Sequence, residues 1–175
     1  MAVELPKATA IANADASNPA TLINNKLYGA RIKEGVGTVE VTSSASIASI
    51  LRLARVHSSW RISSVLLSSD AITSAAGDVG LYDVAAKGVE GAVVDVDFFA
   101  SAVSLASAQQ NTDVTHEALG TGNQNGEIAN VEKPIWQVLG LASDPGKFYD
   151  VAVTLTAAAT AAGTVSAKVQ YVDGN

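Results

Sequence analysis

The regular alternation of apolar and polar residues over 148–172 limits most strongly what this chain can fold into. Every second residue is apolar or aromatic from Tyr149 to Leu155 and again from Val165 to Tyr171, with small or polar residues between them. A period of two is typical of a β-strand with one buried and one solvated face. Because an Ala/Thr/Gly segment separates the two runs, they predict a β-hairpin and an antiparallel β domain.

Further strand signals recur along the chain at intervals typical of a sandwich or barrel. They cover 28–41, 50–56, 60–67, 79–84 and 91–105, with a turn at 57–59. The glycines of the first segment, Gly29, Gly35 and Gly37, predict bulges or bends there. The chain is therefore predicted to be all-β, an antiparallel β-sandwich, although jelly-roll and immunoglobulin-like topologies share these local patterns.

One segment near 128–139 has a helical period instead. Apolar residues at spacings of three and four predict a short helix: Ile128, Val131, Ile135, Val138 and Leu139. Asn130 is a candidate cap and Gly140 a natural stop, and Pro134 fits only in the first turn. Trp136 is expected to plug the sandwich end. The preceding polar segment 120–126 is predicted to be an exposed loop.

The domain organisation follows from where the periodic patterns begin. Residues 1–28 combine prolines, asparagines and alanines without a sustained period, which predicts an extended N-terminal arm. Residues 29–175 are predicted to form a single β-sandwich domain. The arm either frays in solution or lies across a neighbouring subunit as a clamp.

Composition supports a packed domain and excludes several kinds of site. Hydrophobic residues make up 48% of the chain and charged residues 16%, which is enough to build a core. The absence of cysteine excludes disulfides, thiolate nucleophiles and Cys-ligated zinc. No run approaches the ~20 apolar residues of a membrane span, and the first thirty residues lack the pattern of a signal peptide. We expect a soluble protein without a membrane partner.

The charge distribution is uneven. The formal net charge of −6 argues against direct nucleic-acid binding. Through Arg61 the chain has seven Lys or Arg and four Asp or Glu, a balance of +3, whereas the remainder has four and thirteen, a balance of −9. The basic third either steers binding to an acidic protein partner or consists of scattered solvated side chains.

The chemistry of an enzyme is not evident. His57 and His116 lie in separate predicted loops without metal-ligand spacing, and no GxSxG elbow, P-loop or dinucleotide fingerprint is present. A convergent nucleophile, base and orienting group are therefore not predicted. We expect no enzymatic activity, no cofactor and no metal centre.

The aspartates allow one weaker alternative. Asp95 and Asp97 share a strand face if that segment is extended, and Asp78 and Asp83 could join them in space, which would suit Ca²⁺ or an acid/base pair. The alternative is that these aspartates lie on the solvent-exposed face of a strand and bind nothing. The letters Tyr-Asp-Val-Ala occur at 82–85 and 149–152, and both aspartates are expected to face solvent.

Several segments resemble a family of small virion structural proteins of tailed bacteriophages, of the capsid decoration or cement type. The resemblance covers most of the chain after about residue 28 and rests on 37–41, 59–65, 78–82, 95–102, 134–141 and 149–152. It implies a jelly-roll or related β-sandwich on the capsid surface of a virion, after synthesis in the bacterial cytoplasm. The family's motifs are structural and supply no catalytic residues.

The resemblance implies partners instead of a reaction. These would be the major capsid protein and further copies of this chain, as a homo-dimer or homo-trimer. With the charge asymmetry, it makes the basic residues candidate capsid contacts: Arg31, Lys33, Arg52, Arg55 and Arg61. The alternatives are another phage role, in the tail, head completion or fibre, and a carbohydrate-binding sandwich. The last is disfavoured by an aromatic content of 5% and by the expected burial of Trp60 and Trp136.

Overall fold

The structure, a computed structural model, describes residues 6–16, 27–116 and 127–173. It divides into two units, Met1–Arg31 and Ile32–Asn175. In the first unit, six residues of the predicted arm form helix α1, Thr9–Ala14, which the sequence had not predicted. No described helix is long and apolar enough to cross a membrane. The loop predicted over 120–126 lies outside the described residues.

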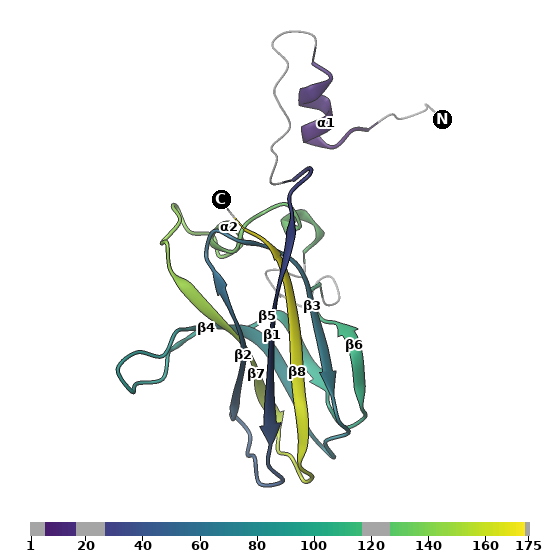
Figure 1. Ribbon diagram of the computed structural model, residues 1–175, viewed down its shortest axis with the longest axis vertical. Coiled ribbons are helices and arrows are strands. Elements are labelled where there is room, and N and C mark those ends of the chain that lie inside the picture. The colour runs from purple at the N-terminus through teal and green to yellow at the C-terminus, as the bar shows by residue number, and fades with distance from the viewer. Residues whose placement is uncertain (1–5, 17–26, 117–126, 174–175) are drawn as a thin grey trace. The chain divides into compact units, whose positions relative to one another are not determined.

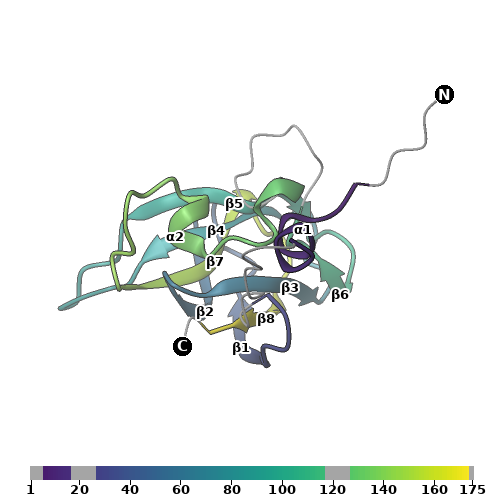
Figure 2. The same cartoon turned by 90° about the horizontal axis from the view of Figure 1, so that it is seen from above.

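The second unit is a sandwich of two antiparallel four-stranded sheets (Figure 1). The first sheet has the order β1-β8-β3-β6 and the second the order β2-β7-β4-β5. The strands are β1 Ile32–Val41, β2 Ile50–His57, β3 Arg61–Ser69, β4 Ala76–Asp83, β5 Val93–Ser104, β6 Gln109–Asp113, β7 Phe148–Ala157 and β8 Gly163–Val172. Figure 2, viewed along the strands, shows the two layers. The predicted all-β sandwich is confirmed.

The connections give the sandwich a jelly-roll topology. Successive strands change sheet at almost every step, so each sheet is built from strands far apart in sequence. Among the described strands, β4 and β5 are the one consecutive pair that is hydrogen-bonded side by side. The sequence had not predicted β6, because its five residues are all polar and show no alternation.

The hairpin predicted over 148–172 is wrong, although both of its strands exist. β7 pairs with β2 and β4 in one sheet, whereas β8 pairs with β1 and β3 in the other. The alternation records only that one face of each strand is buried, and in a sandwich that face contacts the opposite sheet. All but one of the predicted inward residues are buried: Tyr149, Val151, Val153, Leu155, Val165, Ala167 and Val169. Tyr171, the last of them, is half-buried.

Gly37 in β1 allows a close approach to the backbone of β2, and the bulges predicted for β1 are absent. The β1–β8 register is continuous from Ile32 to Val41. A Cβ added at Gly37 would lie 1.6 Å from the carbonyl oxygen of Leu53 in β2, whereas a Cβ at Gly35 would meet nothing within 4 Å. Gly37 therefore lets the edge strands of the two sheets approach each other.

A large irregularity lies instead in β5. The β4–β5 register moves from Val79↔Ala100 to Leu81↔Asp95, so β5 carries extra residues over 96–99. Phe98 and Phe99 are consequently both buried, edge to face at 4.9 Å, where a regular strand would expose one of them.

The helix predicted near 128–139 is broken into two short pieces. A 3₁₀ turn, η1, covers Ile128–Asn130, and α2 covers only Ile135–Val138. Pro134, not Asn130, occupies the N-cap position, because proline cannot continue the earlier turn. Gly140 has a φ of +70° and ends the helix as predicted.

The helix α2 closes the end of the sandwich, but through other side chains than predicted. The backbone N–H groups of Ile135 and Trp136 donate to the carbonyls of Trp60 and Ser58, at 3.0 Å each. Ile135 and Val138 are the buried residues of the helix. Trp136 and Trp60 are only half-buried, so the full burial expected of both tryptophans is wrong.

Candidate interaction site

The loop between β4 and β5, residues 84–92, projects from the side of the sandwich in both views (Figures 1 and 2). Ala86 and Val89 exchange two backbone hydrogen bonds of 3.0 Å around Lys87 and Gly88. Both central residues have positive φ, 52° and 78°, as a type I′ turn requires. Val89 near the tip is 70% exposed. We refer to residues 84–92 as the β4–β5 loop.

Arg52 of β2 holds both legs of this loop at its base. Its Nη1 donates to the carbonyl of Asp83 and its Nη2 to the carbonyl of Gly91, at 3.0 Å each. Its Nε donates to the Glu90 carboxylate at 3.1 Å. A Cβ at Gly91 would lie 1.7 Å from the Asp83 carbonyl oxygen, so the legs can close only on glycine. The base of the loop is therefore tightly constrained, while the tip is free of such bonds to the sandwich in the described residues.

Beneath Arg52 lies the buried carboxylate of Asp150 in β7, which is only 4% exposed. It accepts from Arg52 Nη1 at 3.1 Å and from Arg55 Nε at 2.8 Å. Arg52 also lies over the Tyr82 ring, 5.4 Å from its centroid. The prediction that Asp150 faces solvent is wrong, because the two guanidinium groups cover it and neutralise its charge.

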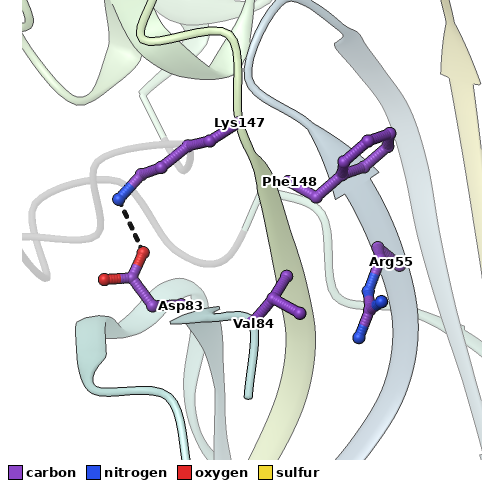
Figure 3. A pocket seen from close by; sticks show the side chains of 5 residues that line it. All are labelled: Arg55, Asp83, Val84, Lys147 and Phe148. Carbon is purple, nitrogen blue, oxygen red and sulfur yellow. Dashed lines mark hydrogen bonds and ion pairs between the residues drawn. The ribbon is translucent and has the colours of Figure 1, made fainter. Parts of the chain in front are cut away.

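Two grooves flank the β4–β5 loop, one along each leg. The first, of about 540 Å³, is lined by Arg55, Asp83, Val84, Lys147 and Phe148 (Figure 3). Lys147 Nζ bonds to Asp83 Oδ1 at 2.6 Å across it, and this bond raises the pKa of Lys147. Phe148 exposes an apolar wall beside these charges.

The second groove, of about 440 Å³, is lined mainly by apolar residues. Its lining consists of Val39, Ala48, Ile50, Leu51, Arg52 and Glu90. Ile50 is 42% exposed, and nearby Ile47 is also exposed. A projecting loop between an apolar groove and a mixed groove suits contact with another protein.

The predicted contact residues of the second unit are divided between its two sheets. Arg52 and Arg55 converge on Asp150 in the second sheet. Lys33 lies on β1 of the first sheet, where it forms an ion pair with Asp173. Arg61 begins β3 and is half-buried, and Arg31 is exposed in the first unit. Arg52 is engaged inside the molecule on all three nitrogens.

The predicted cluster of aspartates does not assemble. Asp78 accepts from the Ala102 N–H at 2.7 Å, and Asp83 pairs with Lys147. Asp95 and Asp97 remain as a pair, in which the Asp97 N–H donates to the Asp95 carboxylate at 3.3 Å. Burial of Asp95, together with the neighbouring Asp97 side chain, raises the pKa of Asp95. Within the described ranges, no three His, Cys, Asp or Glu side chains are grouped to hold a metal ion.

The two histidines lie in different surroundings, His57 against an aromatic ring and His116 at the surface. The His57 ring packs edge to face on Phe148 at 4.9 Å, and its Nδ1 lies 2.8 Å from Ser59 Oγ. His116 is exposed after β6. The turn predicted at 57–59 is confirmed, and there the buried Ser58 hydroxyl donates to Asp144. That bond and the Gly146 N–H lower the pKa of Asp144.

The β4–β5 loop was not recognised as a site from the sequence. The predicted strands over 79–84 and 91–105 leave 85–90 as a connection, but nothing in its residues indicates a binding role. The Arg52–Asp150 bond joins residues 98 apart in sequence and has no local pattern.

Comparison with known proteins gives likenesses of structure only. No family model and no curated protein matches the sequence. A chain from the "Capsid of Ralstonia phage GP4" aligns with 83% of this chain and 86% of its own length, with a TM-score of 0.55 and 13% identity. A chain from the "Cyanophage Pam1 capsid asymmetric unit" aligns with 91% of this chain and 94% of its own, with a TM-score of 0.48 and 16% identity. The first of these likenesses shows that the sandwich fold is shared.

Proposed function

We propose that this protein is a bacteriophage capsid decoration, or cement, protein that binds the assembled head shell and bridges its subunits. The observation that carries the proposal is the shared fold with a chain of the Ralstonia phage GP4 capsid, which extends over most of both chains. The resemblance of the sequence segments to virion structural proteins supports the same conclusion. The partners would be the major capsid protein and further copies of this chain, at the capsid surface of the virion.

The geometry suits a decoration protein, because such a protein needs contact surfaces and carries out no reaction. The β4–β5 loop and its two grooves offer a protruding and a recessed contact within one strand-rich scaffold. A protein that binds only the assembled shell, at 100 times its dissociation constant, stabilises it by ~2.7 kcal/mol per site. Many such sites, repeated by the symmetry of the shell, give a large total from modest contacts.

The basic residues and the N-terminal segment have distinct parts in this proposal. Arg31, Lys33, Arg55 and Arg61 are candidate contacts with an acidic shell surface. Arg52 contributes indirectly, since its guanidinium fixes the base of the β4–β5 loop. Residues 1–28 act as an arm across a neighbouring subunit.

The copy number in purified virions tests the proposal. Quantitative mass spectrometry would measure this chain relative to the major capsid protein. A ratio within a few-fold of one supports a role over the whole shell. A ratio of a few per cent would favour a portal, tail or fibre role instead, and absence from virions would refute a virion protein.

A further inference from the structure

The β4–β5 loop and the apolar groove beside it are complementary surfaces on the same chain. The loop offers Val89, which is mostly exposed, among the small residues Ala85, Ala86 and Gly88. The groove offers apolar walls that remain open to solvent, among them Ile50. A two-fold contact requires both halves of the interface on every copy, and this surface has them.

The charges of the loop favour a second copy as the occupant. Lys87 lies at the turn and Glu90 three residues later, where Glu90 also lines the groove. If two loops meet antiparallel about a two-fold axis between residues 88 and 89, Lys87 of each copy faces Glu90 of the other. Lys87 then finds an opposite partner, and Glu90, which already bonds to Arg52 of its own chain, gains a second one. Val89 of both copies lies close to the axis.

We propose that the β4–β5 loop forms a two-fold contact between two copies of this chain, each loop covering the apolar groove of the other. The Arg52 bonds prepare this contact, because they fix the legs of the loop before association. The contact belongs to the isolated protein. Its test therefore does not depend on the proposed capsid role, and either can fail without the other.

Charge reversal in trans tests the contact. Lys87→Glu and Glu90→Lys would each place two like-charged pairs at the axis, so each variant alone should dimerise about tenfold more weakly than the wild type. A mixture of the two variants restores both opposite pairs and should therefore dimerise more tightly than either variant alone. Sedimentation equilibrium measures all three, with circular dichroism to verify folding.

The trans design separates this contact from a role of Glu90 within its own chain. Loss of the Arg52–Glu90 bond in Glu90→Lys cannot be repaired by adding another variant. A wild-type protein that stays monomeric at about 100 μM, or variants that weaken association without recovery in the mixture, would overturn the proposal. Association that neither variant weakens would overturn it as well.

Single cysteines give a second, independent measurement, since the wild-type chain has none. Val89→Cys should be converted to a covalent dimer by mild oxidation or by a short bismaleimide, because the two thiols lie near the axis. Val36→Cys, at an exposed position of β1 in the other sheet, is the matched control and should remain monomeric. Equal cross-linking of both variants would show random collision and contradict the proposed contact.

Discussion

At the scale of single residues, the outer face of the second sheet depends on one carboxylate. Asp150 is the buried anion between Arg52 and Arg55, and Arg52 in turn holds both legs of the β4–β5 loop. A buried charge is tolerated only when it is paired and hydrogen-bonded, and removing its partner leaves a large desolvation cost. Arg52 thus links the packing of the second sheet, through Asp150, to the position of the β4–β5 loop.

Replacing Asp150 by Asn should destabilise the protein by roughly 1 to 3 kcal/mol, since one amide oxygen cannot neutralise two guanidinium groups. The loss of stability stays in this range because solvent screens the charge of Arg55, whose side chain is 55% exposed. Urea unfolding measures it. Glu34→Gln, at an exposed carboxylate on β1, should change stability by less than about 0.5 kcal/mol. Equal effects of the two substitutions would contradict the importance of the buried pair.

The pH dependence of stability should change in the variant Asp95→Asn. Because burial raises the pKa of Asp95, the folded state keeps its proton to higher pH than the unfolded state does, so stability falls as pH rises above the ordinary value of 3.8. The amide of the variant does not ionise and carries no such penalty. The variant should be more stable than the wild type at pH 7, by up to about 1 kcal/mol after solvent screening, and the gain should vanish below pH 3.8.

Thermal unfolding of both proteins across pH 3 to 8 measures this difference. A variant that is less stable at every pH would show that the hydrogen bond from the Asp97 N–H to a charged Asp95 outweighs its burial.

At the scale of strands, local pattern and long-range pairing carry different information. The sequence patterns predicted every described strand except β6, because a buried face is set within each strand. It could not assign β7 and β8 to their sheets, since both sheets present the same buried face to the core. The broken helix at 128–138 shows a related limit: its apolar spacing is helical, but Pro134 forces a new start there.

Gly37 and Gly35 give a matched test of close approach in β1. Gly37→Ala should destabilise the protein by at least about 2 kcal/mol, because the new methyl group would overlap the Leu53 carbonyl, which belongs to the backbone and cannot turn away. Gly35→Ala, two residues earlier in open space, should be neutral or slightly stabilising. Denaturant midpoints compare them, and similar losses for both would show that flexibility of β1 matters more than its contact with β2.

Deleting residues 1–25 should leave the sandwich folded, because the strands and their core begin with the second unit, at Ile32. The proposed clamp predicts lower occupancy of the shell by the shortened protein. Circular dichroism and co-sedimentation with empty shells measure the two properties separately. Loss of the folded state would show that the segment belongs to the core.

At the scale of the whole molecule, the uneven charge predicted a basic surface, but the structure distributes those residues over both sheets. Arg52 is held inside the molecule by Asp150 and the β4–β5 loop, whereas the side chain of Arg55 binds Asp150 and is still 55% exposed. The uneven charge along the sequence therefore does not show how the basic residues are arranged in space. The role of the β4–β5 loop escaped prediction for a comparable reason, since it depends on the Arg52 bonds from another strand.

Reversing Arg31 and Lys33 to Glu should weaken binding to empty shells about tenfold at low salt and reduce its salt dependence, if these cations face an acidic surface. The variant Lys133→Glu/Lys168→Glu makes the same change in net charge outside the predicted contacts and serves as the control. Co-sedimentation over a range of salt concentrations measures both. Unchanged binding of the first variant at low salt would refute the electrostatic contribution.

The position of β8 in the first sheet has a consequence for how the chain acquires its structure. β8 follows every other strand in sequence, yet it lies between β1 and β3 and hydrogen-bonds to both. Neither of these earlier strands has its main partner until residue 172 has left the ribosome. The first sheet can therefore be completed only after β8 has emerged, and folding should be slow, on the order of milliseconds to seconds, as expected where distant pairings dominate. Among the described strands, β4 and β5 are the consecutive pair that can form a hairpin before β8 is made, whereas one edge of β1 stays unpaired until then.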